Sequence, residues 1–439
     1  MKKNALLKGT LLLTAAGVAS RCIGFFYRIF LSRMFGAEGM GIYELINPIT
    51  ALIFSFCTAG IQSAISKFVA AEPEKDGKPN RLRILLTGMS LSGALSLLCA
   101  VFVYRQADLI SGALLSEPRC APLLRIVSLS FPAACIHSCI NGYFYGIKKA
   151  GLPAFCQLFE QCFRVGSVFF FWSYAQQNQI SFSIAVAAVG LVIGEFASML
   201  AGIPIALLHF STVFCAAQPS VTPYRRVAAR ILLFALPLSA NRVCLHLLGA
   251  VESARIPVSL QRFGYTPGQA ISIYGIFTGM AMTCILFPSA LTNSISVLLM
   301  PLIAEADARR NSGAIRSYLR KSIRGCLLMG LTCLSLFFLC ADFIGTTLFG
   351  SALAGSFIRT LSFLCPFLYL NTMLFSILNG LGKTGLTFLF NIVSLLIRIA
   401  FVFFAIPCFG IQALFAGMLF GQIFSTLCCL LCLKKCRYL

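Results

Sequence analysis

Five arginines stand inside strongly apolar stretches of the sequence, where a guanidinium group needs water, an acid or an anionic ligand. They are Arg21, Arg28, Arg164, Arg242 and Arg398. A charge at the centre of a bilayer costs about 2.5–3.5 kcal/mol on insertion scales and is usually paired or functional. Arginine suits phosphate because its planar fork donates two hydrogen bonds. The five residues are therefore the first candidates for holding an anion.

Arg21 and Arg28 are seven residues apart in one apolar segment, so on a helix both point the same way, roughly 10 Å apart along the axis. The segment has no acid between Lys8 and Glu38. Two cations on one face favour a wet cavity or an anionic ligand. The alternative is that each pairs with an acid on a neighbouring helix, such as Glu44.

A second group of polar residues follows one helical stripe, because Gln157, Glu160, Gln161 and Arg164 recur at helical spacing. Glu160 can bridge to Arg164 at i, i+4, which makes a structural salt bridge the alternative to a binding role. Arg398 has no acid on its own stripe. The sequence therefore favours a binding role for Arg398 more strongly.

A third apolar segment carries Asn241, Arg242, His246 and Glu252. We interpret His246 as an interior histidine rather than a proton carrier. The acids inside apolar segments are fewer than the arginines: Glu44, Glu160, Glu195 and Glu252. A cavity lined by more cations than acids would attract an anion.

The elements that position these residues are membrane-spanning helices. The chain is 59% hydrophobic and 11% charged, against about 25% charged in soluble domains. A span needs about 20 apolar residues. Twelve such segments are predicted, at 6–32, 40–69, 84–104, 121–146, 152–175, 183–208, 228–250, 270–303, 325–348, 356–380, 385–406 and 410–433.

Several other features of the sequence carry no chemistry. The apolar pattern continues past Ser20, so the N-terminal segment is interpreted as a span rather than a cleaved signal. Twenty cysteines lie mostly inside apolar runs and are interpreted as packing residues. With three histidines and no ligand spacing, no metal site, nucleotide loop or cofactor is predicted.

The basic residues predict the orientation through the positive-inside rule. With the N-terminus in the cytoplasm, 23 of the 35 lysines and arginines fall on the cytoplasmic side, seven on the outer side and five inside spans. Both termini are therefore predicted inside. The formal charge of +22 then needs no nucleic-acid partner, since a basic face meeting anionic lipid headgroups explains it.

An internal repeat divides the chain. When Arg125 is aligned with Arg359, the segments 125–170 and 359–404 share eleven identical positions without a gap, including Arg164/Arg398, Gly146/Gly380 and Gly151/Gly385. The glycines are predicted to bracket equivalent tight cytoplasmic turns. A weaker match relates 64–66 to 294–296. The prediction is an all-α protein of two parallel six-helix lobes, 1–215 and 216–439.

Two segments resemble a known family. The run SRCIGFFYRIFLSRMFGAEGMGIYELINPI at 20–49 resembles the opening signature of the stage V sporulation protein B group, and 271–305 resembles its eighth-span signature. This group is a branch of the multidrug/oligosaccharidyl-lipid/polysaccharide exporter superfamily, which also contains the MurJ-type lipid II flippases and the MATE antiporters.

The resemblance implies two lobes around a cationic cavity in a bacterial plasma membrane. It also implies transport of an undecaprenyl-pyrophosphate-linked sugar to the outer leaflet, with Arg21, Arg28 and Arg242 as cavity residues. Members of the branch commonly have fourteen spans, whereas this sequence ends after the predicted twelfth, which favours a lipid-linked sugar in general over a peptidoglycan precursor in particular. Cell-wall synthases could be partners, but the sequence names none.

Other functions compete with this one. A cation-coupled multidrug antiporter would want acids in the first and seventh spans, and the first has none. A membrane glycosyltransferase would need clustered catalytic acids or a large outer loop, and the longest outer loops, near 105–120 and 251–269, are short. A non-transporting scaffold stays open.

Overall fold

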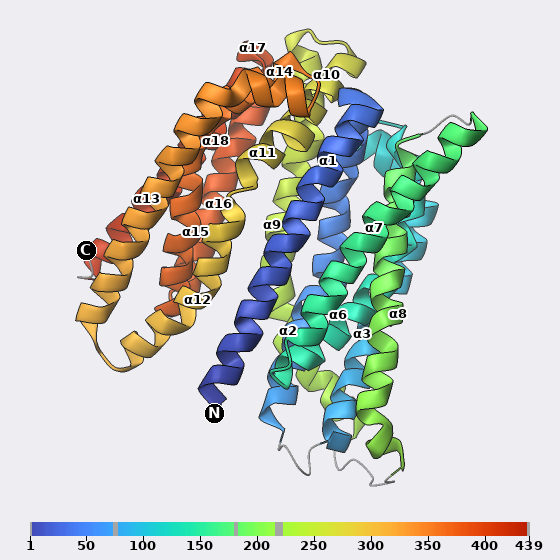
Figure 1. Ribbon diagram of the computed structural model, residues 1–439, viewed down its shortest axis with the longest axis vertical. Coiled ribbons are helices and arrows are strands. Elements are labelled where there is room, and N and C mark those ends of the chain that lie inside the picture. Colours follow the sequence, from blue (N-terminus) through green and yellow to red (C-terminus); the bar gives the residue numbers. More distant parts are fainter. Residues whose placement is uncertain (1, 73–77, 180–182, 216–222, 437–439) are drawn as a thin grey trace. The chain divides into compact units, whose positions relative to one another are not determined.

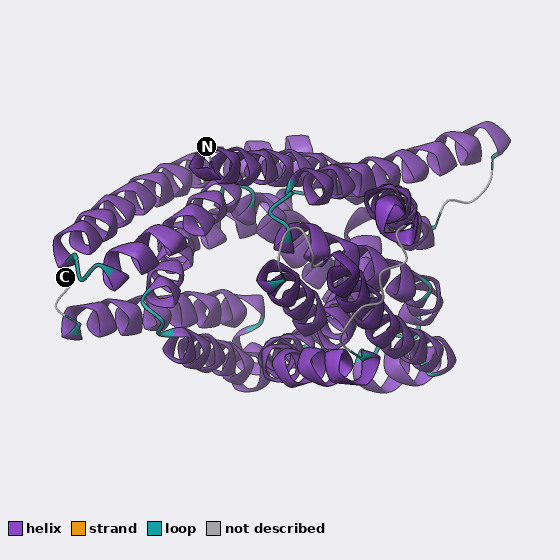
Figure 2. Cartoon of the chain, turned by 90° about the horizontal axis from the view of Figure 1, so that it is seen from below, coloured by secondary structure: helices purple, strands orange, loops and turns teal. Residues whose placement is uncertain are grey.

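All regular structure in the described residues is helical (Figures 1 and 2). The computed structural model describes residues 2–72, 78–179, 183–215 and 223–436. The residues group by contact into two compact units, the first formed by 1–23 with 45–250 and the second by 24–44 with 251–439. The predicted lobe boundary between residues 215 and 216 lies at the edge of the described residues, and the division into 1–215 and 216–439 stays a prediction.

The first half of the chain folds into long helices with short breaks. These are α1 (Lys2–Phe54), the π-helix η1 (Ser55–Ala59), α2 (Gly60–Ala71), α3 (Lys78–Arg105), α4 (Ala107–Leu109), the π-helix η2 (Ile110–Leu114), α5 (Cys120–Ser128), α6 (Ser130–Gly146), α7 (Gly151–Asn178), α8 (Ala185–Cys215) and α9 (Tyr224–Phe263).

The second half repeats the pattern. Its helices are α10 (Pro267–Gly275), the π-helix η3 (Ile276–Ala281), α11 (Met282–Leu286), α12 (Ser289–Ala308), α13 (Ser312–Phe343), the π-helix η4 (Ile344–Leu348), α14 (Ala352–Leu361), the 3₁₀ turn η5 (Ser362–Leu364), α15 (Cys365–Gly380), α16 (Thr384–Ala400), the π-helix η6 (Phe401–Ala405), α17 (Ile406–Phe409) and α18 (Ile411–Lys435).

Ten helices of the described chain are long and apolar enough to cross a membrane, or eleven if the bent pair α5 and α6 forms one span. The twelve spans predicted from the sequence differ from these helices in three places. The first two predicted spans form one helical stretch, Leu13–Ala71, interrupted where Gly36 adopts a φ of 66°. The eighth is divided into two helices between Leu286 and Ser289. The fifth predicted span corresponds to α7, which carries Glu160 and Arg164 and is not among the helices long and apolar enough to cross a membrane. The polytopic all-α class is confirmed.

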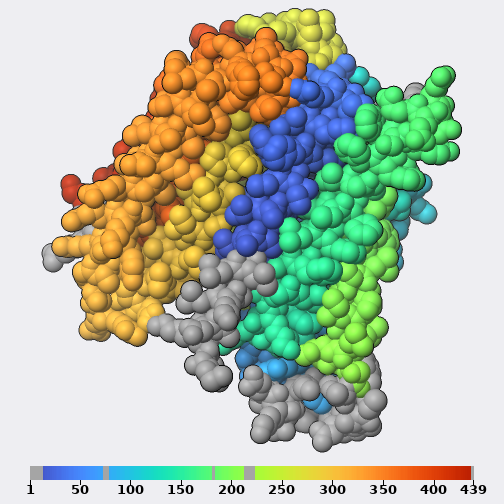
Figure 3. All heavy atoms as spheres, viewed as in Figure 1, coloured from blue at the N-terminus to red at the C-terminus, as the bar shows by residue number. Residues whose placement is uncertain are grey.

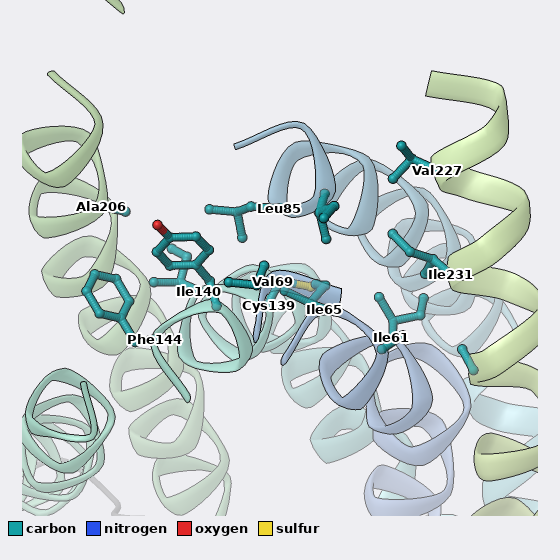
Figure 4. Close-up of a cluster of buried hydrophobic side chains, with 14 of the residues drawn as sticks. Ile61, Ile65, Val69, Leu85, Cys139, Ile140, Phe144, Ala206, Val227 and Ile231 are labelled. Carbon is teal, nitrogen blue, oxygen red and sulfur yellow. The ribbon is translucent and has the colours of Figure 1, made fainter. Parts of the chain in front are cut away.

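Each unit has its own apolar core. In the first unit, buried side chains of α2, α3, α6, α8 and α9 pack together around Ile65 and Ile140 (Figure 4). In the second unit, α12, α13, α15 and α18 pack around Ile303 and Leu374. The packed pairs correspond, since α2 and α3 contact α6 as α12 and α13 contact α15.

The repeat is confirmed at the level of individual contacts. Arg125 pairs with Asp108, and Arg359 pairs with Asp342. The register that aligns Arg125 with Arg359 also aligns Asp108 with Asp342, so the same ion pair occurs in both halves of the repeat. The π-helices η2 and η4 align in the same register. The two aligned segments therefore share an ion pair and a helix break at matching positions, although their sequences have diverged.

Close helix contacts explain Gly146 and Gly380 better than turn strain does, whereas a Cβ on Gly385 would meet nothing within 4 Å. A Cβ on Gly146 would lie 2.7 Å from the Ser66 carbonyl oxygen, and one on Gly380 would lie 2.8 Å from that of Met300. The left-handed residues of the two turns are instead Lys148 and Gly382. The glycines do end α6 and α15, as predicted, but a side chain at either position would push two helices apart.

These contacts also correct one alignment. Gly146 touches Ser66 and Val69, whereas Gly380 touches Met300 and Ile303. Ser66 therefore aligns with Met300 in the register that aligns Arg125 with Arg359. The predicted match of 64–66 with 294–296 departs from this register and is wrong, because similarity over three small residues outweighed the packing register.

Close packing also explains why residues 24–44 group with the second unit. A Cβ on Gly41 would clash with the backbone of Ile271, and one on Gly275 would clash with the backbone of Ala37. In the first unit, the backbone of α2 at Gly60 lies similarly close to the backbone of α9 at Ala235. Glycine at such positions lets two helix backbones approach as they do in many membrane proteins.

Candidate functional site

In the second unit, Arg28 of α1 is held by two partners. Its Nη2 lies 3.2 Å from Glu44 Oε1, and its Nη1 donates a 2.7 Å hydrogen bond to Thr283 Oγ1 of α11. The Glu44 side chain is 8% exposed and that of Arg28 is 34% exposed. The alternative noted from the sequence, a structural pair with Glu44, is therefore present, although the guanidinium keeps an open side.

Arg398 of α16 also has an acidic partner, which its own helical stripe did not supply. Its Nη2 lies 2.7 Å from Oε1 of Glu252 on α9. The Glu252 side chain is 4% exposed and that of Arg398 is 27% exposed. The lack of an acid on its own stripe therefore does not leave Arg398 unpaired, because the acid comes from a helix far earlier in the chain.

In the first unit, Arg164 of α7 lies between two carboxylates. It pairs with Glu160, one turn earlier on the same helix, as the spacing predicted. Its Nη2 also lies 3.5 Å from Glu195 Oε1 on α8. The second oxygen of Glu195, Oε2, lies 2.9 Å from His137 Nε2 on α6. Three helices are therefore joined by one polar cluster of two acids, an arginine and a histidine.

His137 completes this cluster, and sequence reasoning missed it. Its Nδ1 lies 3.1 Å from Ser198 Oγ and 3.5 Å from Asn141 Nδ2. Ligand atoms of His137, Glu160 and Glu195 lie within 4.8 Å of one another, close enough to hold a metal ion. Arg164 already neutralises one of the two carboxylates, and a protonated His137 would neutralise the other. The cluster can therefore balance its charge with its own residues.

Arg21 and Arg242 differ from the three paired arginines. Both are exposed, on α1 and α9 respectively. Among the described residues, neither has an acid within ion-pair distance or a hydrogen-bond partner. A guanidinium in a span without an ion-pair partner must be solvated or bind an anion from outside the chain. Asn241, next to Arg242, is also exposed.

Arg242 adjoins a hollow of about 280 Å³ inside the first unit. The walls come from the end of α1, η1, α2, α6, α7 and α8, and they include Ser55, Thr58, Gln62, His137, Ser138, Glu160 and Glu195. The hollow therefore brings together Arg242 and the polar cluster of α6, α7 and α8. The second unit holds Arg28 with Glu44 and Arg398 with Glu252 as separate pairs.

Comparison with known proteins gives a consistent family. The model of the family described as polysaccharide biosynthesis protein matches residues 6–307. Stage V sporulation protein B of Bacillus subtilis (strain 168) is 28% identical over 97% of this chain and 83% of its own length. Lipid II flippase MurJ of the same organism is 22% identical over 74% of this chain and 62% of its own.

A solved structure shows the same fold. The inward-facing conformation of a multidrug resistance MATE family transporter of the MOP superfamily aligns over 98% of both chains, with a TM-score of 0.75 and 13% identity. At this identity the likeness concerns the fold alone. It agrees with the predicted all-α fold of two lobes.

Proposed function

Because this chain belongs to the polysaccharide biosynthesis protein family, we propose that it is a flippase for an undecaprenyl-pyrophosphate-linked sugar, carried from the inner to the outer leaflet of the bacterial membrane. The cargo would be lipid II or a related cell-wall or polysaccharide precursor. Transport would proceed by alternating access of the two lobes, without covalent chemistry. The similarity to a lipid II flippase and to a sporulation protein supports this class of cargo.

The single observation that carries the proposal is the pair of exposed arginines, Arg21 and Arg242, in helices long and apolar enough to span a membrane. A pyrophosphate carries negative charge and several acceptor oxygens, which guanidinium groups bind through paired hydrogen bonds. Arg28, held on one side by Glu44 and Thr283, keeps an open side that could bind the pyrophosphate in the same way.

The paired residues have a different role in this proposal. The ion pairs of Arg164 with Glu160 and of Arg398 with Glu252 would fix helices rather than touch the cargo. Breaking one partner of a buried pair is strongly destabilising, which makes such pairs effective positioning elements. Asn241, beside Arg242, would supply a neutral hydrogen-bonding group at the edge of the same site.

The orientation belongs to the proposal too. The N- and C-termini would lie in the cytoplasm, since this arrangement places the basic segment around α12 and α13 inside. Arg316 is exposed at the start of α13 and offers a suitable position for a label. In a cysteine-depleted variant carrying Arg316→Cys, an impermeant maleimide should label only after the cells are opened. Strong labelling of intact cells would contradict the orientation.

A leaflet-resolved transport measurement tests the function. The purified chain would be placed in proteoliposomes with lipid II, with a second undecaprenyl-pyrophosphate-linked sugar, or with a fluorescent phosphatidylcholine. An impermeant enzyme or reagent then reports the lipid that reaches the outer leaflet. We expect flipping of at least one lipid-linked sugar and not of phosphatidylcholine. Transport of a cationic dye against a proton or sodium gradient, without sugar flipping, would instead establish the antiporter.

A further inference from the structure

The first four turns of α13 present cations on one exposed face. Arg316, Arg320 and Arg324 follow one another at intervals of four residues, and Lys321 lies beside them. All four are exposed, whereas Ile315 and Leu319 on the opposite face are buried. These four cations, here called the basic stripe, line an open hollow together with the small residues Gly313, Ser317 and Gly325.

Three charges of the stripe, those of Arg320, Lys321 and Arg324, are not neutralised by the acids nearby. Arg309 pairs with Glu305 at 2.7 Å, which occupies that carboxylate. Within the described part of the chain, Arg320, Lys321 and Arg324 form no ion pair and no hydrogen bond. Three cations within about two helical turns repel one another, so an anion at this surface would be stabilised.

The same face continues as apolar surface. Leu328, Leu331 and Leu339 are 68%, 55% and 79% exposed. The part of α13 after Arg324 runs for roughly 28 Å to Phe343, close to the thickness of the hydrocarbon core of a bilayer. Figure 3 shows α13 as a continuous strip of surface in gold to orange. Cations at one end and leucines beyond them match a lipid with a charged headgroup and an acyl chain.

The repeat shows that the fold does not require these cations. In the confirmed register of the repeat, the positions of the stripe correspond on α3 to Leu82, Leu86, Thr87 and Ser90. Two cations of α3, Arg81 and Arg83, lie nearer its start and have local partners, since Arg81 donates to the Glu72 carbonyl and Arg83 stacks on Tyr224. The general excess of positive charge at one membrane face therefore does not account for the stripe.

We propose that the basic stripe of α13 is a binding site for an anionic phospholipid, with the phosphate on Arg320, Lys321 and Arg324 and an acyl chain along Leu328 and Leu331. This site does not depend on the transport function. It would be a lateral contact with membrane lipid. A basic residue that contacts the headgroup of a bound anionic lipid contributes about fivefold to its binding.

Native mass spectrometry of the full-length protein, released from detergent with added phosphatidylglycerol or phosphatidylcholine, tests the site. The variant Arg320→Gln/Arg324→Gln should retain about 25-fold less phosphatidylglycerol than wild type. Arg225→Gln/Arg226→Gln removes the same charge from two exposed residues of α9 and serves as the matched control. It should lie within twofold of wild type. Arg320→Lys/Arg324→Lys keeps the charge and should retain most of the binding.

Each other outcome overturns the proposal. Equal losses in the stripe variant and the control would show general attraction to the membrane. Equal retention of phosphatidylcholine would show that headgroup charge is irrelevant. Displacement by inorganic pyrophosphate would assign the stripe to a soluble phosphate, and preferential displacement by a polyprenyl pyrophosphate would assign it to the transport cargo. Should the double variant lose its detergent melting transition, Lys321→Gln alone must still lower phosphatidylglycerol retention, by about fivefold.

Discussion

Arg398→Ala is expected to lower the amount of folded protein in the membrane severely. The substitution leaves Glu252, whose side chain is 4% exposed, without the cation 2.7 Å away. Removing one partner of a buried ion pair typically costs about 3–5 kcal/mol, because a desolvated charge remains. Membrane abundance and the melting temperature in detergent measure the effect, and both should fall.

Two further variants separate this effect from a general sensitivity to losing arginine. Adding Glu252→Gln should restore much of the stability of Arg398→Ala, since a neutral amide needs no cation. Arg359→Ala is the matched control, because its partner Asp342 is 68% exposed. Exposed pairs are worth about 0–1 kcal/mol, so this variant should melt close to wild type. Normal stability of Arg398→Ala, or no rescue by Glu252→Gln, would contradict the pairing.

The helices and the repeat were predictable from the sequence because they depend on signals that are local or that recur. An unbroken apolar run of sufficient length indicates a span wherever it occurs, and identical arginines and glycines fix a register. The pair of Arg164 with Glu160 was predictable for the same reason, since both lie on one turn of α7. The breaks in the eighth span and the continuity of α1 with η1 and α2 were not, because they arise from packing between helices.

The partners of the other arginines depend on which helices meet. Glu195 reaches Arg164 from α8, and Glu252 reaches Arg398 from α9. The spacing of residues along the chain does not predict these ion pairs between helices. His137 was missed because a single histidine in an apolar helix resembles an ordinary interior residue until Glu195 is placed beside it. The sequence identified which charged groups lie in the apolar segments. Only the packing of the helices shows that, among the residues the structure describes, Arg21 and Arg242 lack the acidic partner that the other three arginines have.

That separation leads to the second large expected effect, in which Arg21→Ala and Arg242→Ala each slow the flipping of lipid-linked sugar without lowering stability. Among the described residues, neither arginine has an ion-pair or hydrogen-bond partner to lose. A hydrogen bond to a charged group contributes about 1.5–3 kcal/mol, so the loss of one such contact in transport corresponds to about a ten- to hundredfold lower initial rate. Lysine keeps the charge but loses the fork, so Arg21→Lys should fall between wild type and Arg21→Ala.

Arg105→Ala removes another exposed arginine, at the last turn of α3, and should flip the cargo at the wild-type rate. Arg28→Ala should differ from Arg21→Ala and Arg242→Ala by also lowering stability, because it removes the ion-pair partner of buried Glu44. Its loss of abundance should be rescued by Glu44→Gln, after which any remaining transport defect measures the contact of Arg28 with the cargo. Wild-type flipping by stable Arg21→Ala and Arg242→Ala variants would end the pyrophosphate assignment. Equal slowing by Arg105→Ala would show that surface charge, rather than these two positions, controls the rate.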